Sequence, residues 1–108
     1  MNLTRITPDY SVASQIAPAD VAEIAALGFR SIMCNRPDAE DPGQPNFAEI
    51  DAAARARGLV TAHVPVVSGA IYEDDVEAFR AAMAELPSPV LAYCRSGTRC
   101  RNLWSLSF

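Results

Sequence analysis

Residues 90–99 of the chain read Val-Leu-Ala-Tyr-Cys-Arg-Ser-Gly-Thr-Arg, and the change of character within this stretch indicates the architecture. The four apolar residues at 90–93 form a compact run that is typical of a buried strand. Gly97 follows in a tight loop, and residues 98–108 have the spacing of a short helix. A buried strand that leads through a glycine-containing loop into a helix is a unit of a parallel sheet covered by helices.

The same alternation extends upstream. Apolar spacing, together with the Gly and Pro residues between segments, divides the rest of the chain into short elements. We expect strands at residues 3–6, 10–12, 29–34 and 59–64, a loop at 35–44, and helices at 18–28, 47–58 and 73–86. Strand and helix alternate from residue 18 onward, which predicts one α/β domain over residues 1–108 with a mostly parallel sheet flanked by helices.

The composition is that of a globular domain with a small excess of negative charge. The chain has 108 residues, half of them hydrophobic, a net charge of −4 and no lysine. This balance does not favour nucleic acid as a partner, because phosphate binding requires a basic surface. The longest apolar runs are too short for a membrane span, and the N-terminus lacks the pattern of a secretory signal. Three widely spaced cysteines predict a reduced, cytoplasmic protein without a disulfide scaffold.

Ligands of such sheets bind beyond the carboxyl ends of the strands, and one of these ends carries a reactive pattern. Cys94 leaves the strand, and Arg99 stands where the next helix begins. Backbone N–H groups of a tight loop at a helix N-terminus converge on negative charge and stabilise a thiolate, while an arginine offers a planar fork of donors to an oxyanion. We therefore predict an anion-binding loop with Cys94 and Arg99 as catalytic residues. The loop residues between them are Arg95, Ser96, Gly97 and Thr98.

Several segments resemble one known family. They are Ala-Tyr-Cys-Arg-Ser-Gly-Thr-Arg at 92–99 with Leu-Trp at 103–104, Ile-Ala-Pro-Ala-Asp-Val at 16–21, Asn-Arg-Pro-Asp at 35–38, Pro-Gly-Gln-Pro at 42–45 and His-Val-Pro-Val at 63–66. Together they are similar to the beta-lactamase-hydrolase-like, phosphatase-like domain family over essentially the whole chain. The resemblance implies a fold similar to that of dual-specificity and tyrosine phosphatases, in domains that occur alone or fused to metallo-hydrolase domains.

The chain departs from this family pattern in three places. Cys100 stands where a serine is expected, and Cys34 stands where an asparagine-like residue is expected. The final helix also ends early, at Phe108, which predicts a poorly buttressed helix behind the anion-binding loop.

The length of the loop bears on the reaction. Tyrosine-phosphatase-like enzymes have the pattern His-Cys-x5-Arg, whereas here Tyr93 replaces the histidine and the arginine comes one position earlier, as in rhodanese-type sulfurtransferases. A six-residue loop from Cys94 to Arg99 curls tightly around the sulfur, whereas a seven-residue loop makes the wider cradle of a phosphoryl group. We therefore expect a sulfurtransferase that forms a persulfide on Cys94 from a thiosulfate-type donor and passes the sulfur to a thiol acceptor.

The alternative reaction is hydrolysis of a phosphate ester by the same nucleophile, through a cysteinyl-phosphate. This phosphatase also needs a general acid for the leaving oxygen. The candidate acids are Asp38, Glu40, Asp41, Glu73 and Asp74. Two further alternatives are a non-catalytic anion-binding module and a thiol redox sensor that responds to oxidation of Cys94.

Other polar residues near the strand ends have both functional and structural interpretations. Asn35, Arg36 and Asp38 follow a strand end on the same side of the sheet as Cys94. They form either a wall of the site or a loop held by an Arg–Asp contact.

The remaining cysteines and the single histidine have two interpretations as well. Cys100 is either a resolving thiol for Cys94 or a small buried residue, and the same holds for Cys34. His63 is expected to be structural. These residues lack metal-ligand spacing, so the sequence predicts neither a metal site nor a cofactor. The pattern gives no expectation for the oligomeric state.

Overall fold

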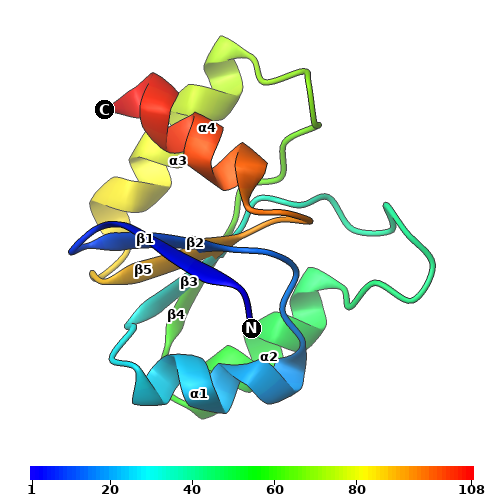
Figure 1. Ribbon diagram of the computed structural model, residues 1–108, viewed down its shortest axis with the longest axis vertical. Coiled ribbons are helices and arrows are strands. Elements are labelled where there is room, and N and C mark those ends of the chain that lie inside the picture. The colour runs from blue at the N-terminus through cyan, green and yellow to red at the C-terminus, as the bar shows by residue number, and fades with distance from the viewer.

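The computed structural model describes all 108 residues as a five-stranded sheet between two pairs of helices (Figure 1). The strands are β1 (Leu3–Thr7), β2 (Tyr10–Ala13), β3 (Ser31–Cys34), β4 (Val60–His63) and β5 (Val90–Tyr93). The helices are the 3-10 turn η1 (Pro18–Asp20), α1 (Val21–Ala26), α2 (Phe47–Ala56), α3 (Glu73–Glu85) and α4 (Thr98–Ser107). The pair α1 and α2 covers one face of the sheet, and the pair α3 and α4 covers the other.

Strand β5 occupies the centre of the sheet, whose order is β1-β2-β5-β3-β4. It pairs in parallel with β2 and β3, β3 pairs in parallel with β4, and only β1 is antiparallel to its neighbour. The register sets Tyr93 beside both Ala13 and Cys34. The carboxyl ends of three strands therefore meet at one edge of the sheet, directly before Cys94.

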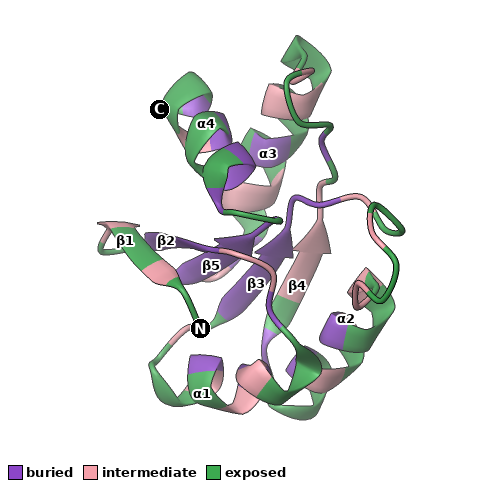
Figure 2. Ribbon diagram, turned by 45° about the vertical axis from the view of Figure 1, so that its right-hand side comes forward, coloured by how far each residue is buried: buried purple, intermediate pink, exposed green.

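The central strands are buried on both faces (Figure 2). On β5, Val90 and Ala92 belong to the core beneath α3 and α4, while Leu91 and Tyr93 belong to the core over α1 and α2. Because each face packs on helices, an uninterrupted apolar run suits this strand better than alternation of polar and apolar residues.

Helix α4, which follows the Cys94 loop, is held by aromatic and polar contacts. The Trp104 ring stacks on Tyr10 with a centroid distance of 4.7 Å, and Phe108 packs on Trp104 at 4.6 Å. Arg80 of α3 donates hydrogen bonds of 3.1 and 2.9 Å to the carbonyl oxygen of Ser107, a group with no partner inside its own helix. These contacts anchor α4 through Trp104 and Ser107, while Leu106 and Phe108 at its end remain exposed.

The predicted α/β class and the order of the elements are confirmed, but most elements are shorter than expected. The helix predicted at 18–28 begins as a 3-10 turn, and its α-helical part covers only Val21–Ala26. The strand predicted at 29–34 begins at Ser31, where pairing with Val90 starts. None of the helices is long and apolar enough to span a bilayer.

Candidate active site

The loop after β5 is built on a glycine in the left-handed region. Gly97 has φ 88° and precedes the first residue of α4, so the chain turns sharply from strand to helix. A Cβ at this position would lie 3.5 Å from the carbonyl oxygen of Ala13, so the loop passes close to β2. The Gln15 N–H donates to the Arg95 carbonyl oxygen at 3.3 Å and ties the other side of the loop to the segment after β2.

The sulfur of Cys94 is enclosed by hydrogen-bond donors. The Gly97 N–H donates to Sγ at 3.1 Å. A hydrogen bond from the Cys100 thiol is the largest of the causes that lower the pKa of Cys94 to about 5. Backbone N–H groups of the loop and of the first turn of α4 act in the same direction, and burial acts against them. Cys94 is therefore a thiolate at neutral pH, which is the nucleophilic form of cysteine.

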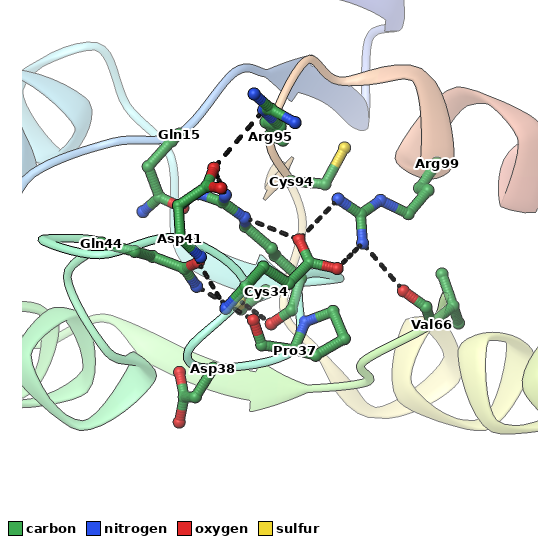
Figure 3. A network of polar contacts seen from close by, with 12 residues as sticks. Gln15, Cys34, Pro37, Asp38, Asp41, Gln44, Val66, Cys94, Arg95 and Arg99 are labelled. Carbon is green, nitrogen blue, oxygen red and sulfur yellow. Dashed lines mark hydrogen bonds and ion pairs between the residues drawn. The ribbon is translucent and has the colours of Figure 1, made fainter. Parts of the chain in front are cut away.

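The guanidinium of Arg99 lies between Cys94 and an acidic loop (Figure 3). Nη1 and Nη2 donate to the two carboxylate oxygens of Glu40 at 2.8 and 2.9 Å, and Nη1 also donates to the carbonyl oxygen of Val66 at 3.0 Å. An arginine has five N–H donors, and these contacts use three of them. The two that remain, on Nε and Nη2, share one edge of the planar group and form a fork for an oxyanion. The Cys94 sulfur is close enough to this arginine to contribute to the raised pKa of Arg99.

Glu40 fixes the orientation of this fork. Its carboxylate also accepts a hydrogen bond from Arg36 Nε at 2.8 Å. The bond from Arg99 is the largest of the causes that hold the pKa of Glu40 at about 2. Glu40 is thus ionised at neutral pH and is excluded as a general acid there, so it acts on the site as a positioning residue.

Asp41 stands beside Glu40 in a second set of ion pairs. Its Oδ2 accepts from Arg36 Nη2 at 2.7 Å and lies 3.6 Å from Arg95 Nε. The remaining terminal nitrogen of Arg36, Nη1, donates to Gln15 Oε1 at 3.0 Å. Arg36 is itself buried, so it holds the two acids in place instead of facing a ligand. The Oδ1 atom of Asp41 has no hydrogen-bond partner in the protein.

A cleft of about 710 Å³ opens in front of the loop. Its lining residues are Glu40, Asp41, Ser68, Arg95, Ser96, Thr98 and Arg99. Cys94 is fully buried and lies behind the loop residues that form one wall of the cleft. The cleft therefore brings together the predicted loop, Arg99 and two of the five candidate acids.

Three of the candidate acids lie elsewhere. Asp38 turns away from Cys94 (Figure 3), and its Oδ1 accepts from the N–H of Phe47 at 2.8 Å, at the start of α2. Glu73 and Asp74 occupy the first turn of α3 and do not line the cleft. Asn35 is also outside the site, because it is fully buried and its Nδ2 donates to the Val64 carbonyl oxygen at 2.9 Å. The structure therefore places Asn35 and Asp38 outside the lining of the cleft.

The other cysteines and the histidine are buried or held by the protein. Burial raises the pKa of the Cys100 thiol well above its usual value, and Cys100 therefore acts as a neutral donor to Cys94. Burial also raises the pKa of Cys34, whose Sγ lies 3.2 Å from the Arg36 carbonyl oxygen. His63 stacks on Phe47 at 4.6 Å, in agreement with its structural interpretation. No three His, Cys, Asp or Glu side chains are grouped so as to hold a metal ion.

Sequence reasoning missed two contributions to the site. Glu40 was considered only as an acid, because its contact with Arg99 joins positions that are 59 residues apart. Ser68 lies in the loop between β4 and α3, and no local pattern distinguishes it from other exposed serines.

Comparison with known sequences finds one family that matches nearly the whole chain. Residues 2–108 match the family described as beta-lactamase hydrolase-like protein, phosphatase-like domain. The chain is 41% identical, over 98% of its length, to a beta-lactamase hydrolase-like protein of Agrobacterium fabrum. It spans only 25% of that protein, so it corresponds to about a quarter of the curated relatives it matches.

Solved structures show the same relationship. The crystal structure of a candidate phosphatase from Neisseria meningitidis is 41% identical, with a TM-score of 0.89 over 96% of this chain and 74% of that chain. The core catalytic domain of the PP-IP phosphatase SIW14 from S. cerevisiae is 16% identical and has a TM-score of 0.69 over 90% of this chain and 57% of that chain, a likeness that shows the fold alone. The expected phosphatase-type fold is confirmed. These similarities favour the phosphatase alternative, and none of them supports the sulfur transfer that the loop length had placed first.

Proposed function

Because the chain belongs to the beta-lactamase hydrolase-like protein, phosphatase-like domain family, we propose that it hydrolyses phosphate monoesters through a cysteinyl-phosphate on Cys94. One observation carries the proposal. The Arg99 fork, the edge of the guanidinium that Glu40 and Val66 leave open, lies beside a cysteine whose pKa is lowered to about 5. A thiolate and an oxyanion fork side by side are the two groups that phosphoryl transfer to sulfur requires.

In the first step, the Cys94 thiolate attacks phosphorus and the bond from phosphorus to the ester oxygen breaks. The free donors of Arg99 and the N–H groups of the loop hold the oxygens of the phosphoryl group, where charge accumulates in the transition state. The leaving oxygen takes a proton from a water molecule in the cleft, because Glu40 and Asp41 are both held in ion pairs with arginines. The products are the free alcohol and a cysteinyl-phosphate.

In the second step, a water molecule attacks phosphorus and the sulfur–phosphorus bond breaks. Asp41 accepts the proton of the attacking water through Oδ1 and passes it to the hydroxide that the first step leaves in the cleft. Cys94 departs as a thiolate, and the same hydrogen bonds that lower its pKa make it a good leaving group. Inorganic phosphate is released and the enzyme returns to its starting state.

The proposal is tested with an aryl phosphate as substrate. We expect the wild-type protein to release inorganic phosphate, and rapid acid quenching followed by peptide mass mapping to find phosphate on Cys94 and on neither of the other cysteines. Cys94→Ser should abolish the reaction, whereas Cys34→Ser, at a buried thiol outside the loop, should retain it. Hydrolysis that persists in Cys94→Ser would refute the mechanism.

Sulfur transfer is retained as a second candidate because of one observation. The six-residue loop directs its donors at the Cys94 sulfur itself, with the Gly97 N–H at 3.1 Å, and a persulfide needs less room than a phosphoryl group. Incubation of the protein with thiosulfate, followed by intact mass measurement, separates the two reactions. Persulfide formation on Cys94 without any hydrolysis of aryl phosphate would make sulfur transfer the function and exclude the phosphatase.

A further inference from the structure

The wall of the cleft in front of Cys94 contains no hydrophobic residue. Small-molecule pockets are lined mainly by hydrophobic and aromatic side chains, with a few polar groups that fix orientation. Here every one of the seven lining residues is polar or charged. An aromatic ring of a substrate would therefore find no hydrophobic or aromatic side chain to pack on, and only the plane of an arginine to stack on.

The polar groups of the wall are of both kinds, donors and acceptors. The Arg95 side chain is 70% exposed and its Nε is 3.6 Å from Asp41, which leaves most of its donors free. Ser68 is exposed on the facing loop between β4 and α3 and offers a hydroxyl group. The Oδ1 atom of Asp41 is an acceptor with no partner. A hydroxyl group of a ligand both donates and accepts, so it complements this mixture.

The two carboxylates of the wall also limit the charge of the ligand. Glu40 and Asp41 are held in the wall of the cleft by ion pairs with arginines, and neither carboxylate can turn away from a ligand without breaking these pairs. The wall carries two arginines against these two carboxylates, so once Arg99 binds one phosphate group no surplus of positive charge remains for a second. The cleft thus suits one phosphate group, which binds Arg99, attached to an uncharged and hydroxylated remainder.

We infer that the substrates are small polyol monophosphates of the sugar phosphate type, with Ser68 and Arg95 recognising hydroxyl groups. This inference rests on the proposed phosphatase function and names the substrate class of the same site. It predicts that such substrates bind more tightly than aryl phosphates, which lack hydroxyl groups on the ring, and that the second phosphate of a bisphosphate adds no affinity.

Binding to the Cys94→Ser variant measures recognition without the different reactivities of the leaving groups. The probes are inorganic phosphate, glucose 6-phosphate, phenyl phosphate, fructose 1,6-bisphosphate and a phosphoserine peptide, each titrated by calorimetry. We expect glucose 6-phosphate to bind about tenfold more tightly than phenyl phosphate, the effect of one or two hydrogen bonds. The bisphosphate should bind no more tightly than glucose 6-phosphate. If Cys94→Ser does not fold, the same ligands serve as inhibitors of aryl phosphate hydrolysis by the wild-type protein.

Matched variants identify the residues responsible. Ser68→Ala should reduce the preference for glucose 6-phosphate over inorganic phosphate about threefold to tenfold. Ser105→Ala, at an exposed serine of α4 outside the cleft, should leave that preference unchanged. Arg95→Ala should weaken glucose 6-phosphate binding, with Arg101→Ala as the control at an exposed arginine outside this cleft.

The outcomes separate this inference from the function on which it rests. Failure of inorganic phosphate to bind would count against the anion-binding loop and hence against the phosphatase itself. If phosphate binds and phenyl phosphate binds as tightly as glucose 6-phosphate, the phosphatase stands and the polyol inference is overturned. Tighter binding of the phosphoserine peptide would likewise overturn it, in favour of a protein substrate.

Discussion

Cys94 and Cys100 are two buried thiols whose pKa values are shifted in opposite directions. A hydrogen bond from Cys100 helps to lower the pKa of Cys94 to about 5, while burial raises the pKa of Cys100 well above its usual value. One proton is therefore held on Cys100 and donated toward the Cys94 sulfur. A serine at position 100, the residue that the family resemblance leads us to expect there, would donate in the same way.

This difference predicts selective alkylation. At pH 6, brief treatment with iodoacetamide should modify Cys94 first, because only its thiol is largely ionised at that pH. The rate for Cys94 should stay nearly constant from pH 6 to pH 8, since ionisation is already almost complete at the lower value. Peptide mass mapping measures both quantities. Preferential labelling of Cys34 or Cys100 would show that the thiolate lies elsewhere.

Arg99 contributes geometry as well as charge. Its terminal nitrogens are held by Glu40 and Val66, so that one edge of the guanidinium faces the thiolate. In Arg99→Lys the charge remains but the two-point fork is lost. We expect kcat/KM for an aryl phosphate to fall about a hundredfold, which corresponds to about 2.7 kcal/mol of transition-state stabilisation. Arg101→Lys, two residues further along α4 and outside the cleft, is the control and should change kcat/KM little.

Among the structural elements, the loop between β5 and α4 combines a backbone requirement with a catalytic one. Gly97 has φ 88° and its N–H contacts the Cys94 sulfur. Gly28, which follows α1 far from the cleft, has a similar φ of 94° and open space around it. Substitution of either glycine therefore meets a similar backbone strain, while only Gly97 contacts the site and has β2 within van der Waals distance of an added Cβ.

Substitution by alanine separates these two roles. Gly97→Ala and Gly28→Ala should each lower the free energy of unfolding by about 1–2 kcal/mol, because alanine resists a left-handed conformation. Only Gly97→Ala should also reduce turnover, since a shift of the loop moves the N–H away from the sulfur. Urea unfolding and aryl phosphate hydrolysis, measured on both variants, make the comparison. Equal loss of activity in the two proteins would mean that the loop geometry is not critical.

The β5–α4 unit was accessible from sequence because its determinants are local. The apolar run at 90–93, Gly97 and Arg99 lie within ten consecutive residues, and each has a direct physical reason. The acidic wall was not accessible in the same way. Asp38 and Glu40 belong to one loop, and the sequence does not indicate that the first caps α2 while the second reaches Arg99. Such assignments depend on how the loop between β3 and α2 folds over the edge of the sheet.

For the molecule as a whole, that loop connects two parts of the fold. It leaves β3, carries Glu40 and Asp41, and pairs with the arginines that follow β5. Arg36 and Arg99 have side-chain exposures of only 4% and 8%, so each needs a partner for its charge. The ion pairs thus hold the acidic loop against the anion-binding loop and shape the cleft between them. Folding and site formation are linked through Glu40.

Glu40→Gln tests this link through the pH dependence of stability. The folded protein lowers the pKa of Glu40 from 4.5 to about 2, so the carboxylate contributes stability that is fully present above pH 4.5 and is lost as the pH falls toward 2. At pH 7 the variant should be less stable than the wild type by about 1–2 kcal/mol, a value moderated by the partial exposure of Glu40. The difference should shrink steadily between pH 4.5 and pH 2. Urea unfolding at a series of pH values measures it, with Glu85→Gln, at an exposed glutamate without an ion pair, as the control. A difference that stays constant across this range would show that Glu40 stabilises the fold by its shape and not by its charge.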